Sequence, residues 1–116
     1  MYQFSYAEIA QDSFSTARER EREALGRSIE AMQRAEAAGP RSREAVEAVF
    51  LTRSLWAILV EDLAEPENQL PEDLRASLIS IGLWIMREAE AIRLGKVKSF
   101  KGLIEVTTSI REGFDA

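Results

Sequence analysis

Acidic side chains are the residues of this chain that could support catalysis, because two carboxylates can act as general acid and general base. Two pairs stand close in the sequence, Glu61 with Asp62 and Glu88 with Glu90. Adjacent residues on a helix point about 100° apart and residues two positions apart diverge further, so neither pair faces one substrate. We therefore expect no catalytic residue and a protein that is not an enzyme.

Histidine and cysteine are both absent from the 116 residues. Their absence excludes zinc sites built from imidazole or thiolate and excludes nucleophilic catalysis by a cysteine–histidine pair. The sequence also contains no phosphate-binding loop, nucleophile elbow or metal-ligand motif. We expect no metal and no cofactor, and the lack of cysteine is compatible with a cytoplasmic protein.

Three lysines, Lys96, Lys98 and Lys101, form a small basic cluster that is either a solvated helix end or a contact for nucleic acid. The chain carries 15 basic and 20 acidic residues, a net charge of −5. Readers of nucleic acid usually carry a basic surface, so we expect no direct DNA binding and do not favour RNA contact.

The apolar runs are too short for a membrane span, which needs about 20 residues. The longest, residues 78–86, is interrupted by Ser80 and Gly82. The N-terminus lacks the basic and apolar regions of a secretory signal. We expect no membrane partner and a cytoplasmic location.

Good helix formers dominate the sequence, and breaks fall at Gly39-Pro40, at residues 65–68 and at Gly95. These signals predict helices over residues 15–38, 42–64, 71–94 and 99–113, with Ser42 as an N-cap and Pro71 in the first helical position. Short connections favour antiparallel neighbours. The prediction is a single all-α domain over residues 1–116, a compact bundle of about four antiparallel helices. A short N-terminal helical turn is added at Ser5, whose spacing to Glu8 is that of a capping box.

The second predicted helix is apolar over most of its circumference, which is typical of a central helix. Its broadest apolar face includes Val46, Val49, Phe50 and Trp56. Arg53 falls inside its apolar face, between Val49 and Ala57. A buried guanidinium needs a partner, so two interpretations are open. In the structural one, Arg53 extends to the rim or pairs with a carboxylate of the third helix such as Glu88; in the functional one, it anchors a binding partner.

The third predicted helix carries two apolar stripes, and a helix buried on one side needs only one. The second stripe includes Ile79, Leu83 and Met86, which are either core residues or an exposed apolar patch for an amphipathic helix. Trp84 is read in the same two ways, with core favoured. The candidate partner-binding residues are Ile79, Leu83, Met86, Leu55, Leu59, Arg53 and Trp84.

Long segments of the chain resemble the FlaF family of flagellin-biosynthesis regulators from alphaproteobacteria. The resemblance rests on MYQFSYAE, ARERERE, ALGRSIE, AGPRSREAVEA, LWAILVEDLAEPENQLPEDLRASLISIGLWIMREAEAIRLGK and FKGLIEVTTSIREG, in this order. It implies a cytoplasmic export chaperone that binds flagellin, whose terminal segments are amphipathic helices, and that promotes flagellin synthesis and secretion. It also implies opposition to the companion regulator FlbT, which restrains translation of flagellin mRNA.

Two other functions remain open at this point. The chain could be a post-transcriptional regulator that acts through FlbT or flagellin mRNA without holding flagellin. Alternatively, the second stripe of the third helix could join two copies in a structural homodimer.

Overall fold

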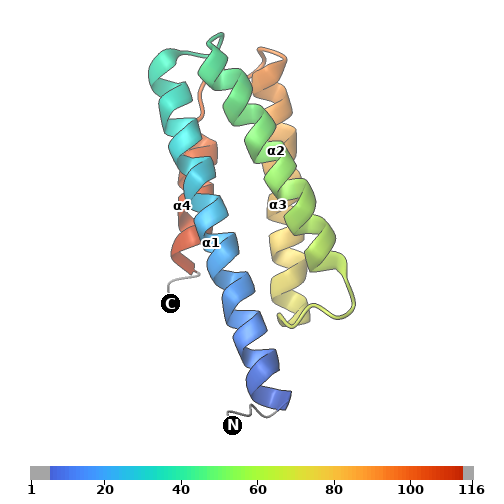
Figure 1. Cartoon of the computed structure of the whole chain (residues 1–116). Helices are drawn as coiled ribbons and strands as arrows, with labels where there is room; N and C mark the ends of the chain where they lie inside the picture. Colours follow the sequence, from blue (N-terminus) through green and yellow to red (C-terminus); the bar gives the residue numbers. More distant parts are fainter. Residues whose placement is uncertain (1–5, 114–116) are drawn as a thin grey trace.

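The computed structural model describes the backbone of residues 6–113 and the side chains of residues 16–113. This part of the chain forms four helices and no strand: α1 (Tyr6–Ala38), α2 (Arg43–Ala64), α3 (Glu72–Arg93) and α4 (Lys101–Gly113). Consecutive helices run antiparallel, with α2 packed against α1 and α3, and α4 packed against α1 (Figure 1). The predicted all-α bundle is confirmed.

The ends of the helices are set by local backbone conformations and hydrogen bonds that the sequence predicts. Gly39 adopts a φ of 107° after α1, and the Ser42 hydroxyl accepts a hydrogen bond of 3.1 Å from the Ala45 N–H at the start of α2. Gly95 adopts a φ of 76° after α3. Pro71 is the residue before α3 rather than its first residue, because its ψ of 144° is not helical, although its carbonyl accepts the Arg75 N–H at 3.0 Å.

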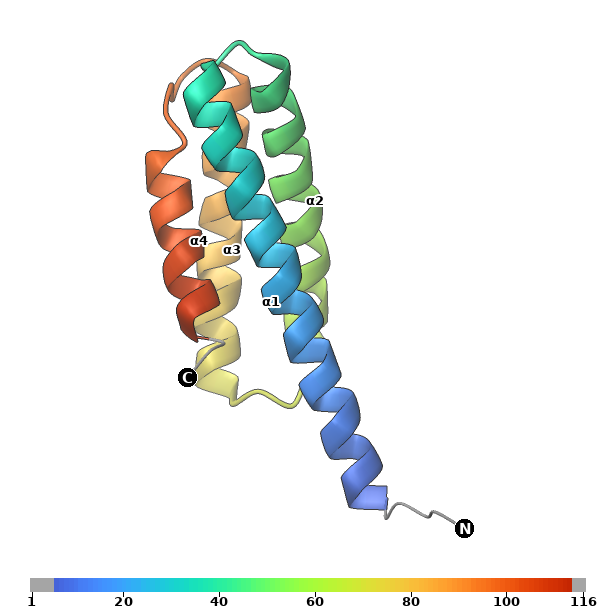
Figure 2. The ribbon, with the colours of Figure 1, turned by 60° about the vertical axis from the view of Figure 1, so that its left-hand side comes forward.

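Two predicted boundaries were wrong. α1 begins at Tyr6 rather than near Ser15, because no glycine or proline interrupts residues 6–25. The expected separate turn is therefore part of one long helix, and its capping residue Ser5 lies outside the described residues. The second difference is at α4, which begins at Lys101 rather than at Ser99. Ser99 precedes the helix, and its hydroxyl accepts a hydrogen bond of 3.1 Å from the Lys101 N–H. Figure 2 shows α1 extending beyond the other helices at its N-terminal end.

The core lies where the four helices face one another. Its largest side chains are at most 1% exposed and come from every helix: Leu25, Met32, Trp56, Ile85, Phe100 and Leu103. Two buried hydroxyls, Ser28 of α1 and Thr52 of α2, satisfy each other through a hydrogen bond of 3.1 Å. The core therefore joins α1 and α2 by a polar contact as well as by apolar packing.

Gly82 brings α3 unusually close to α2. A Cβ atom at this position would lie 2.8 Å from Trp56 Cε3 and 2.8 Å from Val60 Cγ2, closer than such atoms can approach. Only glycine allows this spacing without a shift of the neighbouring side chains. The close approach places the outer sides of α2 and α3 next to each other, where the candidate site lies.

Candidate partner-binding surface

The outer side of α2 carries several apolar side chains that no other described element covers. Val46, Phe50 and Ile58 have 69%, 73% and 67% of their surface exposed. Leu51 and Ala57 are exposed on the same side. We call these five residues the α2 outer face. α2 was expected to be central, but among the described elements it has neighbours on two sides, and a third side of this largely apolar helix is left uncovered by them.

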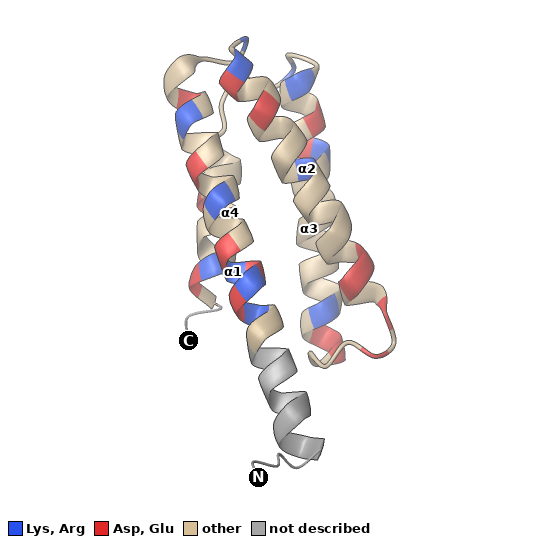
Figure 3. Ribbon diagram, in the orientation of Figure 1, with Lys and Arg blue, Asp and Glu red and all other residues tan. Residues whose placement is uncertain are grey.

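Charge is almost absent along the middle of α2 and α3. Residues 48–60 contain one charged residue, Arg53, and residues 76–86 contain none. The two stretches lie side by side, since Gly82 abuts Trp56 and Val60. Figure 3 shows them mainly in tan, between ends that carry charged residues. We call these two stretches together the apolar band. A contiguous apolar patch bordered by charge is typical of a surface that binds another protein.

The predicted residues of α3 form the edge of this band. Leu83 is 44% exposed, and Ile79 and Met86 are half-buried. Met86 also packs against the core. The spacing of Leu83, Met86 and Glu90 places them on one side of α3, and Glu90 reaches Arg53 on α2. The α2 outer face therefore continues onto α3 through Leu83.

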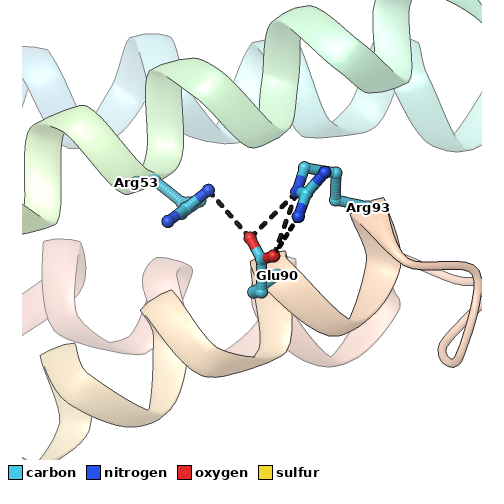
Figure 4. A network of polar contacts seen from close by, with 3 residues as sticks. All are labelled: Arg53, Glu90 and Arg93. Atoms are coloured by element: carbon cyan, nitrogen blue, oxygen red, sulfur yellow. Dashed lines mark hydrogen bonds and ion pairs between the residues drawn. The ribbon is translucent and has the colours of Figure 1, made fainter.

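Arg53 is held by a carboxylate of α3, as one of the two sequence readings proposed, but the partner is Glu90 rather than Glu88. Arg53 Nη1 lies 2.8 Å from Glu90 Oε2, and Arg93 Nε donates to both carboxylate oxygens at 3.0 Å (Figure 4). Arg93 Nη2 also contacts Oε1. The side chain of Arg53 is 44% exposed, so it lies at the rim of the surface.

This network keeps one positive charge beside the apolar band. The hydrogen bond from Arg93, together with the charges of Arg93 and Arg53, holds the pKa of Glu90 below its ordinary value of 4.5. Glu90 therefore stays ionised at neutral pH, and two guanidinium groups share one carboxylate. The remaining charge suits a partner that carries a carboxylate at the border of its apolar stripe.

The other three predicted residues lie elsewhere. Leu59 is a core residue with 9% exposure, and Leu55 is half-buried against the core. Trp84 is half-buried and, with Val106 of α4, lines a shallow depression of about 300 Å³ between α3 and α4. Of the predicted residues, Arg53 and Leu83 are thus exposed next to the α2 outer face, and Ile79 and Met86 are half-buried on the same side of α3 as Leu83. The remaining three pack in or against the core: Leu55, Leu59 and Trp84.

Sequence reasoning assigned Val46 and Phe50 to the same broad face as Val49 and Trp56. The structure divides that face: Val49 and Trp56 are buried, whereas Val46 and Phe50 are the most exposed large apolar residues of α2. The sequence feature that could have predicted this exposure is the apolar circumference of α2, because two neighbouring helices cannot cover a helix that is apolar on nearly all sides.

The described residues contain no group of three or more acidic side chains arranged to hold a metal ion. Within the same part of the chain, no helix combines the length and apolar character that crossing a bilayer requires. The described surface is therefore suited to bind a partner through apolar groups that become buried next to the positive charge of Arg53.

The sequence model of the family described as "Flagellar protein FlaF" matches residues 2–114. No curated protein and no solved structure matches the chain. The family match covers nearly the whole chain, including all four helices and the loops between them. The chain therefore belongs to the FlaF family of flagellar proteins.

Proposed function

We propose that this protein is a cytoplasmic, non-enzymatic export chaperone that binds flagellin and promotes its synthesis and secretion. Membership of the FlaF family gives the chain a role in flagellum biogenesis. The observation that supports the chaperone role is the α2 outer face, where Val46, Phe50 and Ile58 are each at least 67% exposed.

An amphipathic helix is the partner that suits this surface. α2 has 22 residues, so its exposed side runs for about 33 Å. A helix laid along it would bury its own apolar stripe and the α2 outer face at once. Each fully buried side chain of the size of Phe50 or Ile58 contributes about 1.5–3 kcal/mol. The terminal segments of flagellin are amphipathic helices that must be kept apart before the filament assembles.

The test is titration calorimetry of monomeric flagellin into the purified protein, into two variants of the surface and into one control variant. Phe50→Asp and Leu83→Asp each place a charge in the apolar band, and we expect each to weaken binding by tenfold or more, about 1.4 kcal/mol. Leu74→Asp is the matched control. Leu74 and Leu83 are both 44% exposed on α3, and residues nine positions apart lie on opposite sides of a helix, so the control should bind normally.

Circular dichroism on each variant verifies that the fold is intact. If Leu83→Asp and the wild type bound flagellin equally well, the proposal that flagellin binds on the α2–α3 side of the molecule would be wrong. If the protein bound FlbT but showed no affinity for flagellin, its function would instead be that of a post-transcriptional regulator that does not hold flagellin. Light scattering over a range of concentrations separates both from a homodimer built on the same face.

A further inference from the structure

We propose that the end of the bundle opposite the α2–α3 loop is a second docking site, which takes an acidic protein segment carrying a bulky apolar residue. We call this region the basic end. It consists of the loop between α1 and α2 and the loop between α3 and α4, which together line a cleft of about 840 Å³. The lining residues that matter here are Pro40, Arg41, Ser42, Arg93, Leu94 and Lys98.

Positive charge is concentrated at the basic end. Residues 39–43 and 93–101 contain six cationic side chains and no acidic one. Arg43 pairs with Glu47, and Arg93 pairs with Glu90. The other four are exposed and form no ion pair within the described part of the chain: Arg41, Lys96, Lys98 and Lys101. Two of these four, Arg41 and Lys98, line the cleft and are available to an incoming anion.

Two carboxylates on the helices beside these loops are engaged in structural contacts. Glu36 accepts hydrogen bonds from the Ser99 hydroxyl at 2.9 Å and from the Phe100 N–H at 2.8 Å. Glu90 is held by Arg53 and Arg93. A third, Glu44 in the first turn of α2, forms no ion pair with a cation of the cleft within the described part of the chain. The positive charge of the cleft is thus preserved in a chain whose net charge is −5.

The opposite end of the bundle has the reverse charge. Residues 61–73 contain six acidic residues and no basic one. In Figure 3 the ribbon is red at acidic positions around the α2–α3 loop and blue at basic positions on the two loops at the other end. This separation along the bundle attracts an acidic segment to the basic end and repels it from the other.

The lining of the cleft favours a peptide over a nucleic acid. Single-stranded nucleic acids bind through aromatic side chains on which bases stack, and no aromatic residue is among those that line the cleft. Its exposed apolar surface comes from Ala38, Pro40 and Leu94, and Leu94 is 52% exposed. An apolar side chain can pack on Leu94 while flanking carboxylates reach Arg41 and Lys98.

This site goes beyond the proposed chaperone role, because it lies at the end of the bundle, whereas the apolar band lies along the side of α2 and α3. The two surfaces could hold two partners at once. A partner protein with an exposed acidic and apolar segment would then be linked to whatever the α2 outer face carries.

The experiment measures binding of a fluorescein-labelled peptide of repeating Glu-Leu-Glu units to the full chain by fluorescence anisotropy. The Arg41→Glu/Lys98→Glu variant should bind at least about tenfold more weakly, because two favourable charge pairs become repulsive. The control Arg27→Glu/Arg87→Glu makes the same change in net charge at exposed residues outside the cleft and should retain binding. Binding should also weaken as salt is added.

Several results would overturn the proposal. One is equal affinity for a Gln-Leu-Gln peptide, and another is equal loss in the control variant. Binding of polyuridylate in place of the acidic peptide would assign the cleft to phosphate. Association of the protein with itself at low salt, abolished by the cleft variant, would assign it to the acidic end of a second copy. The Arg41→Gln/Lys98→Gln variant repeats the test without added negative charge. Leu83→Asp should bind the peptide normally, so failure here is distinct from failure of the flagellin proposal.

Discussion

Replacement of Gly82 by alanine tests the close approach of α2 and α3 on which the candidate surface depends. The new Cβ would lie 2.8 Å from both Trp56 Cε3 and Val60 Cγ2. Trp56 is 1% exposed and packed in the core, so it has little room to move. The change must therefore push the two helices apart or force a side chain from its preferred rotamer.

Two opposing effects set the size of the change. Alanine in place of glycine within a helix normally stabilises by about 1 kcal/mol. Overpacking of a core contact costs about 1–3 kcal/mol. The net effect of Gly82→Ala is then a loss between about 0 and 2 kcal/mol. Gly102 of α4 is the control, because a Cβ there would meet nothing within 4 Å, and Gly102→Ala should stabilise by up to about 1 kcal/mol.

Urea denaturation followed by circular dichroism measures both free energies of unfolding. We expect Gly82→Ala to be less stable than Gly102→Ala by about 1–3 kcal/mol, which is the cost of the contact alone. The same variant should weaken partner binding through the displaced edge of α3. If both substitutions stabilised the protein equally, the close packing of α2 against α3 would be refuted.

Three further predictions concern other parts of the bundle. Thr52→Val leaves the buried Ser28 hydroxyl without its partner and should cost about 1–3 kcal/mol in urea denaturation, whereas adding Ser28→Ala should restore much of the loss. Glu36→Ala removes the acceptor for the Phe100 N–H at the start of α4 and should cost about 1–3 kcal/mol; Glu36→Gln, which keeps a carbonyl acceptor, should cost less in the same assay. Burial raises the pKa of Glu21 above 4.5, against the lowering effect of Arg18, so the folded state binds this proton more tightly than the unfolded state. The contribution of Glu21 to stability is therefore lost as the pH rises from 4.5 through the raised pKa. Over this range the melting temperature of Glu21→Gln should rise relative to that of the wild type. A constant difference would contradict the burial of Glu21.

The helical architecture could be predicted from the sequence because its determinants are local. The glycine after α1, the Ser42 cap and the glycine after α3 act within a few residues of the helix ends they define. The start of α1 could not be predicted as well, since no glycine or proline marks where its N-terminal turns begin. The start of α4 also depends on Glu36, which is distant in sequence and accepts the Phe100 N–H.

The candidate surface was only partly predictable, because helical periodicity does not reveal how many neighbours a helix has. The periodicity of the sequence predicts the second apolar stripe of α3, and Leu83 on this stripe is exposed. The sequence places Phe50 and Val46 on a broad apolar face of α2, and they are exposed because none of the described helices covers its third side. The partner of Arg53 was expected on α3, but the choice between Glu88 and Glu90 depends on the rotation of α3 against α2.

Photo-crosslinking from position 50 tests the central claim most directly. The wild-type sequence with benzoylphenylalanine in place of Phe50 is mixed with monomeric flagellin and irradiated, and the joined peptides are identified by mass spectrometry. The same probe at Glu105, which is exposed on α4, is the control. We predict crosslinks from position 50 to one terminal helix of flagellin and none from position 105. Equal crosslinking from both positions, or none from position 50, would contradict the assignment of flagellin to the α2 outer face.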